Sequence, residues 1–531
     1  MATKDRVIDS MEALTAAHDE AVALLDTDPA AAIALAESCI PGSGHEDNVQ
    51  QLQAAMYTDG GLQLNRADLV KRGAEIWRAL SPDPKPNIAY NLANAELGIF
   101  QAAAAATDDL AAAWSENVSH LQNARALFRR VAKDAASPLN LRLQALTNAG
   151  NAFDIVGRYL DALDLYDEAL ALDPGFAMAL GNRGVALEHS ARLMRDHAPT
   201  VLSEAVANLD AALAQPDAVG RFGGRSAFDV FAKVRQRIKG PPSSGPDPEV
   251  KKPWADPHAD WCRRHELFLH VSHRCLHEDT ERLDPLFFRG VTTGLDDASQ
   301  DRVRQFVDAF DAIKQDYVAA RYTAWLASER TSPIRAHSAA ISDRVTFLDS
   351  LEYARWGVRT GMAVQALAAA TNVLDKVASF VHLYLGTARK VQSVYFEWLW
   401  QARDKPMDKP IAVLLKRPDV NMGLLALCDL SYDLRSDTPL ARRVDLRHTS
   451  THRFLVAHTE VAPPSDDWFD RLEWDELVKE SIAQLQVARA ALIYLARMID
   501  IAEYRAPKKD PKHPTPSIPI PPADSRLSEH D

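Results

Sequence analysis

The strongest constraint on the fold is a pattern of small residues in the first half of the chain. Gly184 follows Gly150 after 34 residues. Between them, Gly150 and Ala162 leave room for two helices to pack closely, and Pro174 ends the second helix. One such pair of helices cannot bury its apolar face alone. The repeat therefore predicts several stacked helical hairpins over roughly residues 1–215.

The spacing of these residues resembles that of the tetratricopeptide repeat. The matching residues are Gly150, Asn151, Phe153, Gly157, Tyr159, Ala162, Tyr166, Ala169, Leu170 and Pro174. In the next repeat, helices are expected at 177–190 and about 201–213. Repeats of this kind form a solenoid with an extended concave surface, so we expect it to bind a peptide or protein partner. A rigid scaffold or a dimerisation arm is the alternative.

Composition predicts an all-α protein. Apolar residues make up 47% and charged residues 25% of the 531 residues, and Ala-rich runs with helical periodicity dominate, without a series of alternating strands. Four cysteines indicate no disulfide framework. Because residues 1–6 lack a signal-peptide core and the apolar run 362–385 contains polar residues, we expect a cytoplasmic protein without a membrane span. The net charge of −13 disfavours nucleic-acid binding over the whole surface but permits a local basic cleft.

Changes in composition divide the chain into five parts. The expected parts are a tetratricopeptide-like repeat domain (1–238), a Pro/Gly/Ser-rich linker (239–257), a helical connector (258–330), a helical bundle (331–505) and a disordered tail (506–531). The bundle helices are expected at 347–386, 391–401, 423–435, from 439 onward, and at 474–504.

Two polar groups outside the repeats have structural as well as functional interpretations. The run Cys262, His265, His270, His273, Cys275 and His277 contains zinc-ligand side chains. Its apolar neighbours and the lack of paired C-x-x-C spacing favour packing with polar edges, so no metal ligand and no cofactor is assigned. Asp375 and Lys376, within an apolar helix, either orient the bundle or form a solvated edge.

The stretch 447–452 is entirely polar within an otherwise amphipathic predicted helix. Thr438 and Pro439 fit an N-cap and a first helical residue. Leu440, Val444, Phe454 and Leu455 keep helical spacing and predict a buried stripe, onto which Arg447 and Thr451 also fall.

Arginine and histidine at this stretch could together cleave RNA without a metal. An imidazole would move a proton near neutral pH, and Arg447 would hold the phosphate. Positions five apart lie about 140° apart around a helix, so Arg447 and His452 flank the polar stretch instead of touching. A second copy of the chain across a two-fold axis could complete the site.

Three Arg-x4-His pairs overlap in this region and differ in what they enclose. They are Arg443/His448, Arg447/His452 and Arg453/His458. Only the second is polar throughout with its arginine on the inward face. We therefore select Arg447 and His452, with His448 as a further cleft residue.

The region from about 347 to 501 resembles the HEPN superfamily, whose hallmark is an arginine, a polar residue, a few more residues and a histidine. Here that is Arg447-His448-Thr449-Ser450-Thr451-His452. Further segments resemble the bacterial HEPN subgroup with N-terminal tetratricopeptide repeats. These segments are 146–151, 178–187, 261–262, 267–269, 375–378, 446–455 and 488–495.

The resemblance implies an antiparallel helical bundle that dimerises and a metal-independent endoribonuclease, often with a toxin, abortive-infection or antiviral role. Arg447 and His452 would be the catalytic pair and RNA the substrate. The residue after the arginine is often Asn in such motifs and here is His448. The alternative is a non-catalytic adaptor in which repeats and bundle bind protein, RNA or nucleotide.

Overall fold

The structure is a computed structural model of the 531-residue chain. It describes residues 5–25, 27–81, 83–191, 193, 198–238, 254–274, 284–288, 291, 297–329, 332–348, 352–387, 390, 393–399, 407–435, 454–466 and 468–505. The chain divides into two compact units. The N-terminal unit comprises Met1–His189, Ala205–Ser243 and Leu415–Val420, and the C-terminal unit comprises Ser190–Glu204, Ser244–Leu414 and Asn421–Asp531.

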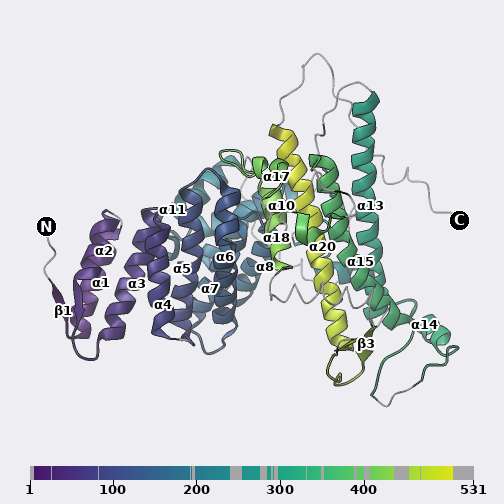
Figure 1. The fold of residues 1–531 in the computed structure, drawn as a ribbon, viewed down its shortest axis with the longest axis horizontal. Helices are drawn as coiled ribbons and strands as arrows, with labels where there is room; N and C mark the ends of the chain where they lie inside the picture. The colour runs from purple at the N-terminus through teal and green to yellow at the C-terminus, as the bar shows by residue number, and fades with distance from the viewer. Residues whose placement is uncertain are drawn as a thin grey trace. The chain divides into compact units, whose positions relative to one another are not determined.

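The N-terminal unit is built of antiparallel helices that follow one another in pairs (Figure 1). They are α1 (Met11–Leu25), α2 (Pro29–Ser38), α3 (Glu46–Gln63), α4 (Ala67–Leu80), α5 (Pro86–Ala105), α6 (Leu110–Lys133), α7 (Leu139–Asp154), α8 (Tyr159–Leu172), α9 (Ala177–Ala191), α10 (Ala198–Leu213) and α11 (Pro216–Arg237). The end of α9 from Ser190 and the start of α10 up to Glu204 fall in the C-terminal unit. Each of α3 to α7 packs against the next, and α3, α5 and α7 also contact one another in turn. Such nearest-neighbour packing is the arrangement of a helical solenoid.

The repeat glycines lie where helices approach most closely. A side chain on Gly150 of α7 would overlap the ring of Tyr166 on α8. On Gly184 of α9, a Cβ atom would lie 2.7 Å from Cγ of Leu209 on α10. The helices predicted at 177–190 and 201–213 correspond to α9 and α10. The spacing of small residues thus reflects real helix-to-helix contacts.

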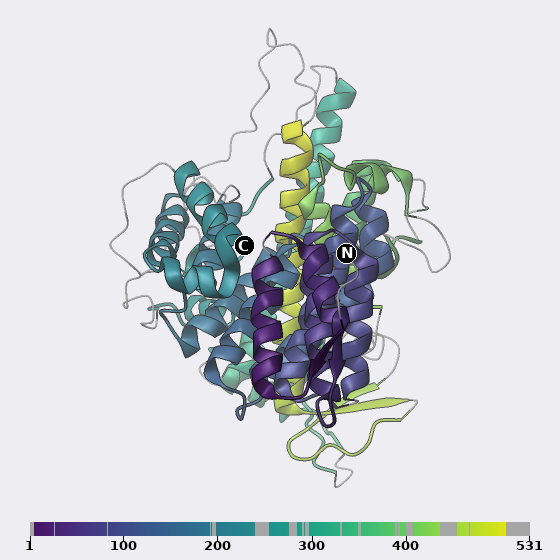
Figure 2. The same ribbon diagram turned by 90° about the vertical axis from the view of Figure 1, so that its left-hand side faces the viewer.

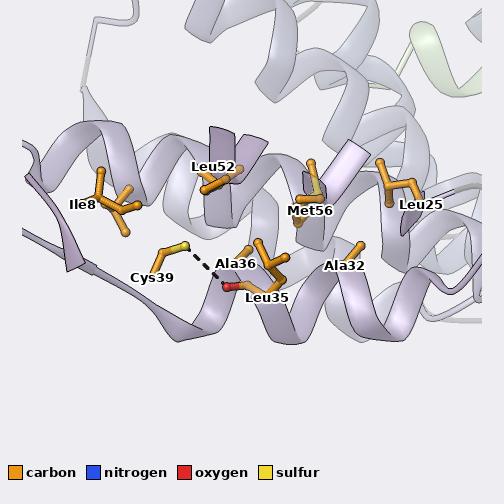
Figure 3. Packing of buried hydrophobic residues seen from close by; sticks show 11 residues of the cluster. Ile8, Leu25, Ala32, Leu35, Ala36, Cys39, Leu52 and Met56 are labelled. Atoms are coloured by element: carbon orange, nitrogen blue, oxygen red, sulfur yellow. Dashed lines mark hydrogen bonds between the residues drawn. The ribbon is translucent and has the colours of Figure 1, made fainter. Parts of the chain in front are cut away.

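The N-terminus contains a short parallel strand pair that the helical periodicity did not predict. Strand β1 (Arg6–Ile8) pairs with β2 (Cys39–Pro41). Figure 3 shows Ile8 and Cys39 in one apolar cluster with residues of α2 and α3, and the Cys39 Sγ donates to Leu35 O at 3.4 Å. The strands thus close the first core of the unit.

The C-terminal unit is a helical bundle with a second small sheet. Its elements are α12 (Pro257–Arg264), the 3₁₀ turn η3 (Ser272–Arg274), α13 (Asp297–Ser328), α14 (Arg335–Ser342), α15 (Val358–Leu385), α16 (Phe396–Leu399), α17 (Lys409–Leu414), α18 (Met422–Asp433), β3 (Phe454–His458), β4 (Phe469–Glu473) and α20 (Trp474–Arg505). Helices α13, α15 and α20 pack along one another, and α18 packs against α20. Figures 1 and 2 show the strand pair at the end of the bundle where α20 begins. The all-α prediction is confirmed, and α13 belongs to the bundle although it falls in the predicted connector.

Two predicted helices of the bundle are shorter than expected. The helix predicted at 347–386 begins only at Val358, because Gly357 has a φ of 129° that ends helical geometry on its N-terminal side. Of the helix predicted at 391–401, the structure describes the single turn α16. The linker residues 239–253 and the predicted tail 506–531 lie outside the described residues.

The prediction that Phe454 and Leu455 continue a helix from Pro439 is wrong. Both residues belong to β3, which pairs in parallel with β4, from Phe454 opposite Phe469 to His458 opposite Glu473. Leu455 and Ala457 contact the core between α15 and α20. The strand depends on a partner about 15 residues further along the chain, which helical spacing does not reveal.

Helix α20 is long and apolar enough to cross a membrane by length and composition. However, 78% of its apolar window is buried inside the protein. Within the described part of the chain it is the single helix that passes this test. The burial is that of a core helix in a globular bundle.

Candidate functional site

Arg447, His448 and His452 lie outside the residues that the structure describes, as do Leu440 and Val444 of the predicted stripe. The structure does describe the two elements between which this stretch runs. Helix α18 ends at Asp433 and strand β3 begins at Phe454. We describe these two flanking elements, α18 and β3, as the anchors of the stretch 447–452.

The first anchor, α18, is fixed tightly to α20. Asn421 caps α18 by accepting from Leu424 N at 3.0 Å, and its Nδ2 donates to Met498 O of α20 at 2.8 Å. A side chain on Gly423 would collide with the backbone at Met498. Almost every residue of α18 is buried. The helix that precedes the motif is thus held on all sides.

The second anchor, β3, is held along both edges. One edge pairs with β4. At the other edge, Ala354 forms an antiparallel bridge with His458, Arg355 N donates to Ala457 O at 2.7 Å, and Thr459 N donates to Tyr353 O at 3.0 Å.

His458, from the third Arg-x4-His pair, is enclosed. The side chain is 1% exposed, and its Nδ1 donates to Glu352 O at 2.8 Å. Its Nε2 is buried without a hydrogen-bond partner among the described residues. A histidine so placed packs the strand and is closed to a substrate, which argues against the Arg453/His458 pair.

The described part of the His/Cys run serves packing. Cys262 Sγ lies 3.3 Å from His258 Nε2, and the His265 ring packs at 5.1 Å from Trp261. Burial raises the pKa of the Cys262 thiol to about 12, which disfavours the thiolate that a metal requires. Among the described residues no group of three or more potential ligands could hold a metal ion. Cys275, His277 and the side chain of His273 lie outside the described residues.

Sequence reasoning missed a buried ion pair beside this run. Arg321 of α13 forms two hydrogen bonds with Asp284, at 3.1 and 2.7 Å, and also donates to Leu267 O at 3.0 Å. Burial alone would raise the pKa of Asp284, but the charge and hydrogen bonds of Arg321 outweigh it and lower this pKa. The pair fixes the segment after α12 to the bundle.

A second buried arginine reaches the same segment from α20. Arg489 is 3% exposed and donates to Phe268 O at 2.6 Å and to His270 O at 2.9 Å. The sequence does mark both arginines as unusual, because each interrupts the apolar stripe of its own helix. Which groups they contact could not be read from spacing.

Residues 298–502, from α13 to α20, match the LA2681-like HEPN family. The matched part of the bundle, 298–502, is a HEPN domain. No curated protein matches the chain. The family match does not extend over the N-terminal helices, so the tetratricopeptide assignment stays a prediction. A HEPN domain indicates, in general terms, a ribonuclease or nucleotide-binding function.

Within the HEPN domain, the polar pair of α15 joins helices. Lys376 Nζ forms an ion pair with Asp316 of α13. Asp375 Oδ1 accepts from Phe396 N, at the start of α16, at 3.0 Å. Asp375 is partly buried and joins α15 to α16, whereas Lys376 is exposed in its ion pair with Asp316, so the structure supports an orienting role for Asp375 and a solvated edge at Lys376.

Arginines gather where α15 of the HEPN domain begins. Arg359 donates to Ala327 O at 2.9 Å and Glu329 O at 3.2 Å, at the end of α13. The Arg355 guanidinium lies 3.9 Å from the ring centroid of Trp474. Burial, and then the nearby charges of Arg355 and Arg335, lower the pKa of Arg359. Positive charge is thus concentrated beside the strand that follows the motif.

Proposed function

We propose that the chain is a metal-independent endoribonuclease whose repeat unit binds a partner. The observation that carries the proposal is the LA2681-like HEPN match over 298–502, which encloses the Arg447–His452 motif. The two anchors of that motif, α18 and β3, are both rigidly packed. Precise positioning of catalytic groups requires such supports.

The proposed reaction is attack of a ribose 2′-OH on the adjacent phosphate. One histidine, His452 in our assignment, takes or returns a proton, and Arg447 stabilises the charge on the phosphate oxygens. The bond between phosphorus and the 5′-oxygen breaks, and that oxygen receives a proton. His448 lines the same cleft. A second copy of the chain would bring the other half of the site.

The test is cleavage of RNA by purified protein in the presence of EDTA. Arg447→Ala and His452→Ala should each reduce the rate at least a hundredfold, within the range of about 10²–10⁴ that a general acid or base contributes. Matched controls are Arg304→Ala and His18→Ala, whose side chains are 69% and 55% exposed and far from the motif in sequence. Binding of RNA without turnover would instead favour the non-catalytic adaptor. Retained cleavage in both motif variants would reject the assignment.

For the partner site we propose a row of polar side chains on the first helices of consecutive hairpins. Asn148 Nδ2 of α7 donates to Tyr90 Oη and Asn94 Oδ1 of α5, both at 3.0 Å. Asn182 Nδ2 of α9 donates to Asn151 Oδ1 at 2.9 Å. All five are half-buried, so they retain accessible surface. Side-chain amides both donate and accept, which suits the main chain of an extended peptide.

A cellular experiment separates this partner site from the catalytic site. In cells, Asn148→Ala combined with Asn182→Ala should abolish the RNA cleavage that depends on the partner. Cleavage by the purified protein should stay unchanged. Asn123→Ala, exposed on α6, is the control. Equal cellular activity of the double variant and the control would reject the partner site. A toxin or antiviral role is the setting in which such triggered cleavage would act.

A further inference from the structure

The polar side chains of the partner site form one hydrogen-bonded network across α5, α7 and α9. Tyr90 Oη of α5 donates to Gln144 Oε1 of α7 at 3.2 Å and accepts from Asn148. Asn151 Nδ2 donates to Asn148 Oδ1 at 3.5 Å, and Asn151 Oδ1 accepts from Asn182 of α9. We call this network the ladder, and its members are Tyr90, Asn94, Gln144, Asn148, Asn151 and Asn182.

Two carboxylates lie beside the ladder. Asp59 is on α3, which packs against α5. Burial raises the pKa of Tyr90, hydrogen bonds from the ladder amides oppose this, and the charge of Asp59 adds to it. Asp154 follows Asn151 by three residues and so shares its face of α7. Burial and then the charge of Asp154 raise the pKa of Tyr166, whose hydroxyl donates to Asn151 at 2.9 Å.

Both carboxylates are open to a ligand. Within the described part of the chain, neither side chain makes a hydrogen bond or an ion pair. Asp59 is exposed and Asp154 is half-buried. The protein packed around Asp59 nevertheless raises the pKa of its carboxyl to about 6, and burial raises the pKa of Asp154 against the opposing charge of His189. An ionised carboxylate in such surroundings is stabilised by a cation that a ligand brings.

The first helices of the hairpins supply no such cation. Helices α3, α5, α7 and α9 contain two arginines and no lysine. Arg142 donates to Ala132 O of α6 at 3.0 Å, and Arg183 donates to Asp167 of α8 at 2.6 Å, so second helices engage both. A face with unpaired carboxylates repels RNA and attracts a positively charged segment.

We propose that the ladder and its two carboxylates bind an extended protein segment that carries arginine or lysine side chains. The ladder amides bond with the main chain of the segment, because amides both donate and accept. Asp59 and Asp154 pair with its cationic side chains. The inference rests on the proposed function in one respect, namely that the repeat unit holds the partner site.

The two carboxylates also set the spacing of the basic residues. Helix α3 contacts α5, and α5 contacts α7. Helices in contact lie about 8–10 Å apart, so Asp59 and Asp154 are separated by roughly 16–20 Å across the ladder. An extended chain advances about 3.3 Å per residue. A separation of about six residues covers this distance and places both basic side chains on the same side of the segment.

The test is binding of labelled peptides to the purified full chain, followed by fluorescence anisotropy. The probes are Ala/Gly peptides with arginine, glutamine or glutamate at two positions six residues apart. The arginine peptide should bind about tenfold more tightly than the glutamine peptide, because two ion pairs form where water is partly excluded. Asp59→Asn with Asp154→Asn should remove this preference. Asp59→Lys with Asp154→Lys should transfer it to the glutamate peptide.

Two controls show that the carboxylates themselves are responsible. Glu75→Gln with Glu116→Gln removes the same charge from exposed positions on α4 and α6 and should keep the preference. Binding of the glutamine peptide, which depends on the ladder alone, should be unchanged in the asparagine variant and shows that the ladder is intact.

Equal binding of the arginine and glutamine peptides to the unmodified chain would overturn the inference. A preference that survives in the asparagine variant, or that is lost in the Glu75/Glu116 control, would overturn it as well. RNA cleavage without a peptide preference would reject this inference alone. A preference for the arginine peptide in a chain that cleaves no RNA would reject the proposed ribonuclease and leave the inference standing.

Discussion

The two units bury charged side chains in different ways. In the N-terminal unit, buried Glu96 pairs with Arg78 and His120, which lie 18 and 24 residues away in sequence. In the C-terminal unit, Arg321 contacts Asp284 and Leu267, 37 and 54 residues away, and Arg489 contacts Phe268 across 221 residues. The first set joins neighbouring helices, and the second ties a distant segment into a bundle.

This difference has a consequence for how each unit loses its structure. A solenoid is stabilised by contacts between neighbours, so a local defect weakens a few helices. A bundle closed by long-range contacts loses several elements together when one such contact is removed. Hydrogen exchange read segment by segment distinguishes the two behaviours.

The largest effect is expected for Arg321→Met in the HEPN domain. The change leaves the buried Asp284 carboxylate without the charge of its arginine partner, with only Leu269 N still donating to it at 2.7 Å, and breaking such a pair costs about 3–5 kcal/mol. Exchange protection should fall together in α12, α13 and α20. The control is Arg321→Met with Asp284→Leu, which removes both charges and should recover most of the stability. If the double variant were as unstable as the single one, the ion pair would not be the cause.

A smaller and more local effect is expected for Gly150→Ala in the repeats. The added methyl group overlaps Tyr166, and overpacking of this kind costs about 1–3 kcal/mol. Protection should fall mainly in α7 and α8. The control Gly220→Ala lies in a helix with nothing within 4 Å of the new atom, so it should raise stability slightly. Equal loss of protection across the whole N-terminal unit would contradict the nearest-neighbour description.

The smallest effect is expected from pH, and its window should differ between the units. Burial lowers the pKa of His258 and of His265. The unfolded chain then binds more protons, so the C-terminal unit loses stability as pH falls below ~6.5. Glu96 behaves otherwise. Burial would raise the pKa of Glu96, but hydrogen bonds from His120 and Arg78 lower it. The stability that the ionised Glu96 contributes is therefore lost only when the pH falls below ~4.3.

Denaturant unfolding at a series of pH values, followed by segment-resolved exchange, measures both windows. His258→Gln with His265→Gln should flatten the pH dependence of the stability of the C-terminal unit between pH 7 and 5 and leave that of the N-terminal unit unchanged. A pH dependence that persists in the double variant would assign it to other groups.

Most helices could be predicted from sequence because their signals are local. Predictions at 177–190, 423–435 and 474–504 correspond closely to α9, α18 and α20. Periodicity, caps and small residues at close contacts act within one or two helices.

What escaped prediction depends on distant partners. The spacing of Phe454 and Leu455 predicts a helix, because the pairing of β3 with β4 and with the segment at Ala354 is not visible in that spacing. The Arg321–Asp284 pair and the carbonyl contacts of Arg489 escaped for the same reason. The motif residues Arg447, His448 and His452 were selected from sequence and stay a prediction.

In the function that we propose, this HEPN domain cleaves RNA by attack of the ribose 2′-OH without a metal. The most direct test is the chemistry of the product ends after incubation with purified protein in EDTA. We expect 5′-hydroxyl ends together with 2′,3′-cyclic phosphates, and their loss in Arg447→Ala and His452→Ala. Fragments with 5′-phosphate and 3′-hydroxyl ends, or intact RNA, would contradict it.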